Sequence, residues 1–98
     1  MSYDVVSAYT LVIGDEHGPP IVSVHATADD AWRALDLEVR RRCRMRARPR
    51  RRVDAEATAR LADAWRAVER ENRFWQIRPH QLPIMVPDVA PRVLAGQR

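Results

Sequence analysis

The sequence contains no lysine, so all seventeen of its basic residues are arginine. A GC-rich genome favours arginine and alanine codons, and part of this bias can therefore come from mutational pressure. Cys43 is the only cysteine, which excludes an intrachain disulfide and indicates a reducing compartment. No apolar run approaches the ~20 residues that a membrane span needs, and the N-terminus does not resemble a signal peptide. We expect a cytoplasmic protein with no membrane attachment.

Glycine is also scarce, with three residues in 98. The sequence has no Walker-type glycine loop, no G-x-S-x-G and no H-E-x-x-H. Asp15, Glu16 and His17 are acid/base groups by type, but they lie in a predicted turn where no burial would tune their pKa values. A chain of this size also has little volume for a closed pocket. We expect no enzymatic activity and no cofactor.

Three histidines and the cysteine are the only residues that suggest a metal site: His17, His25, His80 and Cys43. Their spacing matches no compact ligand pattern, so we expect no bound metal. Cys43 lies among arginines, whose positive field would lower the pKa of a thiol. Its spacing from the apolar residues before it instead favours a small apolar side chain at the end of a buried helical stripe.

The arginines are concentrated in one segment. Nine of the seventeen lie between residues 40 and 52, where there is no acid, so this segment carries +9 and the rest of the chain −5. We call residues 40–52 the arginine segment. Such an asymmetry indicates a polyanionic partner, because a concentrated positive field attracts and holds phosphates.

Two apolar segments near the N-terminus predict a β-hairpin. Residues 4–13 (DVVSAYTLVI) are rich in β-branched and aromatic side chains and are apolar on both alternating faces, as in a central strand. Residues 14–20 hold turn formers and two prolines, and residues 21–26 (IVSVHA) then resume the alternation.

Two helices are expected next, because Thr27 and Asp54 both fit the N-cap position and acidic residues follow in the first turn. The first should end near Ala47, since Pro49 disfavours helical geometry before it, and the second near Asn72. The expected buried stripes are Trp32, Leu35, Val39 and Cys43 in the first helix and Ala57, Leu61, Trp65 and Val68 in the second. The expected i,i+4 ion pairs are Asp36 with Arg40 and Glu38 with Arg42.

Residues 74–77 (FWQI) predict a short third strand, which Pro79 would end or confine to a sheet edge. We therefore predict an α+β fold in the order ββααβ, with an antiparallel sheet covered on one face by both helices. Residues 1–82 would form the domain and residues 83–98 a proline-rich extended arm without regular structure. The arm holds more apolar side chains than a solvated tail needs, so it or an edge strand is a candidate for homodimerisation.

The stretches HATADDAWRAL, where a strand runs straight into a helix, and FWQIRPHQL cover about a fifth of the chain. In both, the chain resembles small uncharacterised ββααβ proteins of high-GC bacteria and of their phages or plasmids. The resemblance implies a fold and no activity.

The arginine segment is the main candidate site, because guanidinium groups bind phosphates in a bidentate manner. The candidate binding residues are Arg41, Arg44, Arg46, Arg48, Arg50, Arg51 and Arg52. No zinc-finger, RNP or helix-turn-helix pattern surrounds them, so backbone contact with little sequence preference is expected. The leading hypothesis is a non-enzymatic accessory or regulatory protein that contacts nucleic acid or a nucleoprotein complex. The alternative is a protein-protein interaction module, an inhibitor or adaptor, that docks on an acidic protein surface.

Overall fold

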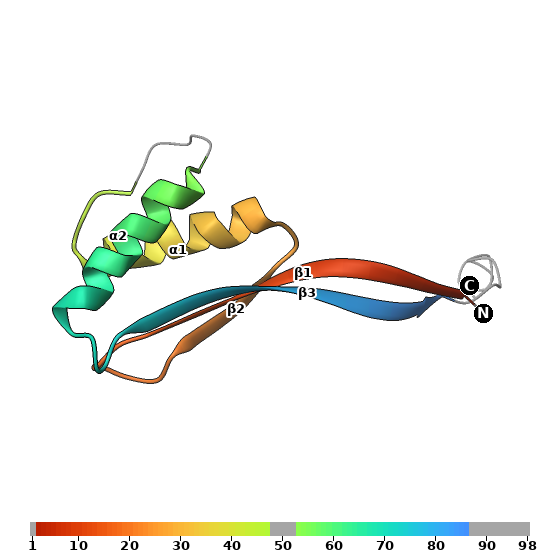
Figure 1. The fold of residues 1–98 in the computed structure, drawn as a ribbon, viewed down its shortest axis with the longest axis horizontal. Coiled ribbons are helices and arrows are strands. Elements are labelled where there is room, and N and C mark those ends of the chain that lie inside the picture. Colours follow the sequence, from red (N-terminus) through yellow and green to blue (C-terminus); the bar gives the residue numbers. More distant parts are fainter. Residues whose placement is uncertain (1, 48–52, 87–98) are drawn as a thin grey trace, which may run out of the picture.

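The computed structural model describes residues 2–47 and 53–86. Its elements follow the predicted ββααβ order (Figure 1), and the small α+β fold is confirmed. They are β1 (Ser2–Gly14), β2 (Ile21–His25), α1 (Ala28–Arg42), α2 (Ala55–Val68) and β3 (Phe74–Val86).

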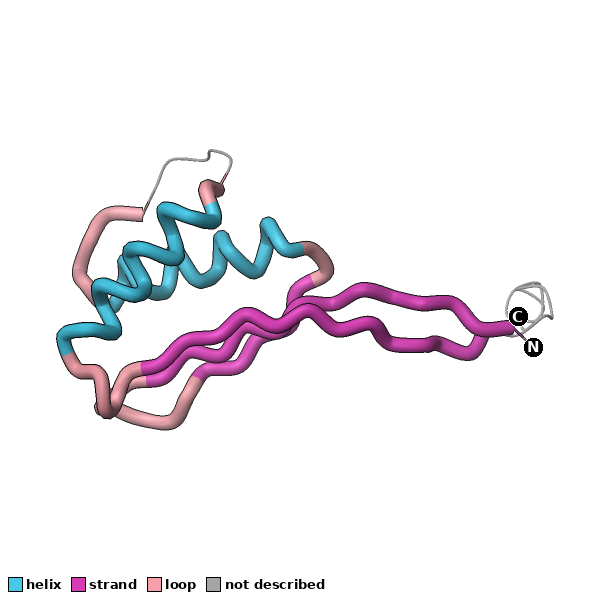
Figure 2. The backbone as a smooth tube through the Cα atoms, viewed as in Figure 1, coloured by secondary structure: helices cyan, strands magenta, loops and turns pink. Residues whose placement is uncertain are grey.

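The three strands form one antiparallel sheet in the order β2-β1-β3, so β1 is the central strand, as its two apolar faces predict. β2 pairs with β1 from Tyr9 to Ile13 only, whereas β3 pairs with all thirteen residues of β1. Both helices lie on the same face of the sheet (Figure 2). They run in the same general direction, so the end of α1 and the start of α2 lie at opposite ends of the helix pair. This geometry explains why the helices are joined by a long connection rather than a tight turn.

β3 is much longer than the predicted short strand. It continues through Pro79 and Pro83 to Val86, so residues 83–86 of the expected irregular arm are paired with β1, while residues 87–98 lie outside the described residues. Pro79 does not end the strand. It lies in an edge strand, which was the other predicted possibility. Proline lacks only a donor, and on the edge that faces away from β1 no donor is needed.

Both helices begin where predicted. The Thr27 hydroxyl accepts from the backbone N–H of Asp30 at 3.1 Å, and the Asp54 carboxylate accepts from those of Glu56 and Ala57. Both end earlier than predicted, α1 at Arg42 and α2 at Val68. After α2, the N–H groups of Asn72 and Arg73 bond back to the carbonyl of Glu69 and close a turn instead of continuing the helix.

The core lies between the sheet and the helix pair. It consists of Leu11 and Ile13 from β1, Ala31, Leu35 and Val39 from α1, and Ala62 and Trp65 from α2. Two predicted stripe residues are wrong, since Cys43 is exposed and Val68 is 76% exposed. The buried face of α2 is rotated toward Thr58, whose hydroxyl reaches a buried carboxylate of α1, Asp36, at 3.5 Å.

Trp75 connects β3 to both helices. Its ring meets that of Trp32 edge to face, with ring centroids 5.9 Å apart, and its indole N–H donates to the carboxylate of Asp63 at 3.1 Å. Gly14 pairs with Phe74, the residue before Trp75. A Cβ at residue 14 would lie 2.6 Å from the phenyl ring, so only glycine fits at this position.

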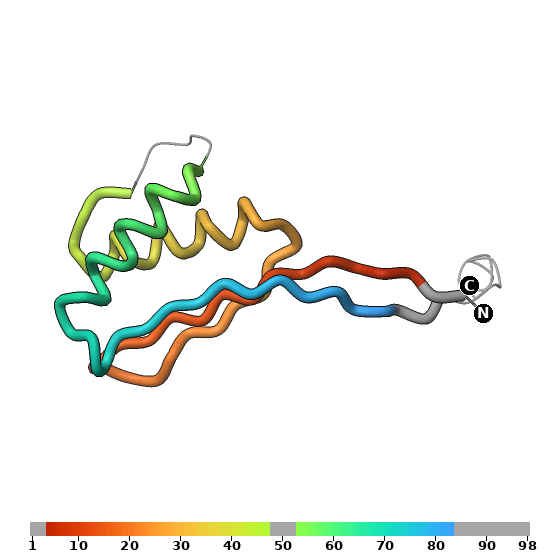
Figure 3. The backbone as a smooth tube through the Cα atoms, viewed as in Figure 1, coloured from red at the N-terminus to blue at the C-terminus, as the bar shows by residue number. Residues whose placement is uncertain are grey.

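The molecule is elongated, with principal extents of 56 × 30 × 25 Å and a radius of gyration of 18.3 Å. A compact chain of this length has a radius of gyration of about 13 Å. Ser2–Ala8 of β1 and the paired residues 80–86 of β3 project beyond the helices and lengthen the molecule (Figure 1), and the coloured parts of both segments can be followed in Figure 3. We call this pair of segments the distal ribbon. Within residues 2–47 and 53–86, no helix is long and apolar enough to span a bilayer.

Candidate polyanion-binding face

Three consecutive arginines end α1, and acids one turn earlier take up their charges. The Nε of Arg40 donates to both carboxylate oxygens of Asp36 at 3.1 Å, and both side chains are largely buried. Glu38 accepts from Arg41 and from Arg42. The predicted i,i+4 pairs are therefore confirmed, and these arginines hold the end of the helix in place.

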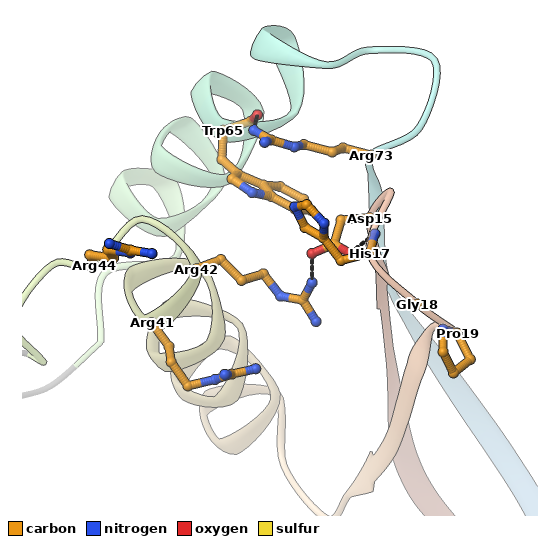
Figure 4. Close-up of a pocket in the computed structure, with 9 residues that line it drawn as sticks. All are labelled: Asp15, His17, Gly18, Pro19, Arg41, Arg42, Arg44, Trp65 and Arg73. Carbon is orange, nitrogen blue, oxygen red and sulfur yellow. Dashed lines mark hydrogen bonds and ion pairs between the residues drawn. The ribbon is translucent and has the colours of Figure 1, made fainter.

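Arg42 also connects α1 to the β1–β2 turn, because its guanidinium pairs with Asp15. The same group lies 5.9 Å from the ring centroid of Trp65. On the other side of that indole, the guanidinium of Arg73 lies 5.3 Å from the centroid (Figure 4). Trp65 is thus held between two cations, each of which gains from the negative face of the ring.

Arg73 is fixed from two directions. Its Nε and Nη2 donate to the two carboxylate oxygens of Glu16 at 3.1 Å, and its Nη1 donates to the carbonyl of Trp65 at 2.9 Å. The hydrogen bonds from Arg73 lower the pKa of Glu16 from 4.5 to about 2, and they raise the pKa of Arg73 in turn. This bidentate pair connects the β1–β2 turn to the start of β3.

Arg44 occupies a backbone conformation that normally belongs to glycine, with φ of 57°. Its N–H bonds to the carbonyl of Arg41 and that of Met45 bonds to the carbonyl of Arg40, at 3.2 and 2.8 Å. This pair of bonds is the Schellman motif that ends helices, and residue 44 is the position where the motif prefers glycine. The motif explains why α1 ends at Arg42, several residues before Pro49 would stop it.

Arg44 and Arg46 follow α1 and differ from the three arginines that end it. Within the described parts of the chain, no carboxylate pairs with Arg44 or Arg46, and both residues are exposed. The remaining arginines of the segment lie outside the described residues. We call all six of these the outer arginines: Arg44, Arg46, Arg48, Arg50, Arg51 and Arg52.

Arg41 is an intermediate case among the predicted binding residues. The hydrogen bond that Arg41 donates to Glu38 raises the pKa of Arg41, yet its side chain is 65% exposed and its charge faces solvent. Arg41 and Arg44 thus line one cavity and Arg46 follows them at the C-terminal end of α1, whereas Arg40 and Arg42 are structural residues.

A cavity of about 420 Å³ lies beside this helix end. Its lining includes Arg41, Arg42, Arg44, Arg73 and Trp65, with Asp15 and His17 from the β1–β2 turn. Asp15 and Glu16 form ion pairs with Arg42 and Arg73, so the exposed positive charge of the lining comes from Arg41 and Arg44. The cavity therefore adjoins the basic C-terminal end of α1.

Sequence reasoning missed the contributions of Arg73 and of the acids in the β1–β2 turn. In the sequence Asp15 and Glu16 are acid/base groups by type, and in the structure they form ion pairs with arginines from distant parts of the chain. Nothing in the local sequence marks a contact between residues 57 positions apart. The only signal in the sequence is charge: the β1–β2 turn holds two adjacent acids, and arginines follow or end both predicted helices.

A comparison of the chain with protein-family models, with curated proteins and with solved structures found no match.

Proposed function

We propose that this protein is a non-enzymatic accessory or regulatory protein that contacts the phosphate backbone of nucleic acid through the outer arginines. The observation that supports the proposal is the division of the arginine segment into matched and unmatched charges. Acids take up Arg40, Arg41 and Arg42, whereas residues 43–52 contain no acid.

The conformation of Arg44 supports the same function. A non-glycine residue in the left-handed region costs about 1 to 2 kcal/mol, and such strain is concentrated at functional sites. Arginine at this position places a guanidinium at the rim of the cavity, which glycine would not do. Arginine therefore occupies a position where helix termination alone would favour glycine.

The expected mode of contact is electrostatic. Guanidinium groups donate two parallel hydrogen bonds to phosphate oxygens, and binding releases counterions from the nucleic acid. The protein should consequently bind with little sequence preference.

The test is fluorescence anisotropy with labelled duplex and single-stranded nucleic acid over a salt series. The variant R44Q/R46Q removes two outer arginines, and R33Q/R60Q removes two exposed arginines that are paired with Asp30 and Glu56. Each phosphate contact contributes about −0.9 to the slope of log K against log salt on a duplex, so R44Q/R46Q should flatten the slope by about 2. R33Q/R60Q should leave it unchanged, and equal effects of the two variants would refute the assignment.

A protein partner with an acidic surface is the alternative outcome. It is distinguished by affinity capture from a lysate treated with nuclease. Loss of all partners after nuclease supports nucleic-acid binding, whereas a stoichiometric protein that remains bound to wild type and is lost with R44Q/R46Q supports the interaction module.

A further inference from the structure

The distal ribbon lacks the support that the rest of the sheet receives. No helix covers it, and apolar side chains on both of its faces are exposed, Val5 by 64%, Val6 by 42% and Leu82 by 50%. A two-stranded ribbon is marginally stable in water on its own. The ribbon is therefore the part of the fold that has most to gain from additional strands.

The two prolines of β3 identify which backbone groups are free. Pro79 pairs with Tyr9 and Pro83 with Val5, and neither proline has an N–H to donate. These pairs must be the non-hydrogen-bonded pairs of the ladder, so the odd-numbered residues of β1 direct their N–H and C=O groups away from β3. From Tyr9 to Ile13 those groups meet β2, but at Tyr3, Val5 and Ser7 no strand of the described chain lies beside them.

The other sheet edges are protected against pairing. Along the outer edge of β3, Pro79 and Pro83 remove alternate donors, which is a common device against edge-to-edge association. The outer edge of β2 is only five residues long. The free edge of β1, in contrast, is seven residues long, from Ser2 to Ala8, and contains no proline.

We infer that the free edge Ser2–Ala8 of β1 pairs antiparallel with the same edge of a second copy of this chain, giving a four-stranded sheet across a two-fold axis. The centre of the edge is Val5, an odd-numbered residue whose backbone faces outward. Pairing centred on Val5 uses all seven residues of each edge and places Tyr3 opposite Ser7 of the other copy. In this register the outward-facing backbone groups of Tyr3, Val5 and Ser7 form hydrogen bonds with those of Ser7, Val5 and Tyr3 of the second copy.

The side chains are compatible with this pairing. Asp4 is the only charged residue of the edge, and in this register it faces Val6 of the second copy rather than the second Asp4. The two Val5 side chains meet at the axis, where each exchanges water for an apolar neighbour. A register centred on Asp4 would place like charges opposite each other and is disfavoured for that reason.

The first test measures the mass of the full chain by light scattering over a dilution series. Wild type should approach twice 11.3 kDa as the concentration rises. V5P removes the donor at the two-fold axis without removing a bond to β3, and it should remain a monomer. Q81P is the matched control, because it removes a donor on the outer edge of β3, opposite Ser7, and should dimerise like wild type. Circular dichroism of both variants reports whether the fold is kept.

The second test does not depend on a folded proline variant. In a Cys43→Ser background, V5C should form an intermolecular disulfide under mild oxidation, because paired Cα atoms at the axis lie about 5.5 Å apart. V6C should cross-link far more slowly, since diagonal neighbours lie about 7 to 8 Å apart. A wild type that stays monomeric throughout the dilution series, or faster cross-linking of V6C than of V5C, would overturn the inference. Neither result depends on binding by the arginine segment.

Discussion

The backbone N–H of Met45 donates to the carbonyl of Arg40 at 2.8 Å, across the left-handed residue Arg44 between them. This bond ends α1 and directs the chain out of the helix at the point where the unmatched arginines begin. Helix termination and the start of the candidate binding face are thus the same structural event.

Replacement of Arg44 should separate stability from binding. R44G relieves the left-handed strain, which raises the free energy of unfolding. The greater entropy of glycine in the unfolded chain offsets part of this gain, so the net increase should be at most about 1 kcal/mol. The same variant should bind a labelled duplex more weakly. R44A is the control, because it loses the charge but keeps the strain. Urea denaturation and anisotropy measure the two effects, and a loss of stability in R44G would contradict the strain at this position.

The carboxylate of Asp36 is expected to be the most important polar group of the helix pair. It accepts both bonds from Arg40, and the side chains of the pair are 8% and 15% exposed. D36A should lower the free energy of unfolding by about 3 kcal/mol, because it leaves a buried guanidinium without its partner. R60A removes an exposed pair and should cost less than about 1 kcal/mol. Urea denaturation of both variants tests this, and equal losses would contradict the role of burial.

The pair between Glu16 and Arg73 should make stability depend on pH in acid. Because the pKa of Glu16 is lowered from 4.5 to about 2 in the folded protein, its contribution is present above pH 4.5 and is lost as the pH falls toward 2. The stability difference between wild type and E16Q should therefore shrink across this window. Urea denaturation at several pH values measures it, and a constant difference from pH 6 to pH 2 would show that the carboxylate is not stabilised by Arg73.

Neutralising Glu38 should strengthen polyanion binding. Glu38 accepts hydrogen bonds from Arg41 and Arg42, so E38Q releases one positive charge at the exposed end of α1. The salt slope of duplex binding should steepen by about 1. E56Q changes the overall charge equally but lies at the start of α2 beside Arg60, and it should leave the slope unchanged. Steepening of the same size in both variants would indicate a response to net charge alone.

Local signals in the sequence predicted much of the fold. The caps at Thr27 and Asp54, the hairpin turn and the apolar faces of β1 each act within a few residues, and each led to the observed element. The length of β3 could not be predicted in this way, because proline is excluded from a strand only where its partner needs a donor, and that depends on the sheet edge. The rotation of α2 toward Thr58 likewise depends on a buried carboxylate of another helix.

The candidate site shows the same division. Intrahelical pairing of Arg40 and Arg42 follows from i,i+4 spacing and was predicted, whereas the ties of Arg42 to Asp15 and of Arg73 to Glu16 join residues far apart in the chain. The left-handed conformation of Arg44 could not be predicted, because the Schellman motif is normally recognised in a sequence by a glycine at this position.

The most direct test of the proposed function replaces all six outer arginines with glutamine in the full chain. Duplex binding is then measured at low salt, with circular dichroism as a check on the fold. The outer arginines are predicted to supply nearly all of the affinity, so binding should be lost while the fold is kept, because Arg40, Arg41 and Arg42 remain occupied by their acids. A folded variant that binds the duplex as tightly as wild type would contradict the assignment of nucleic-acid binding to these residues.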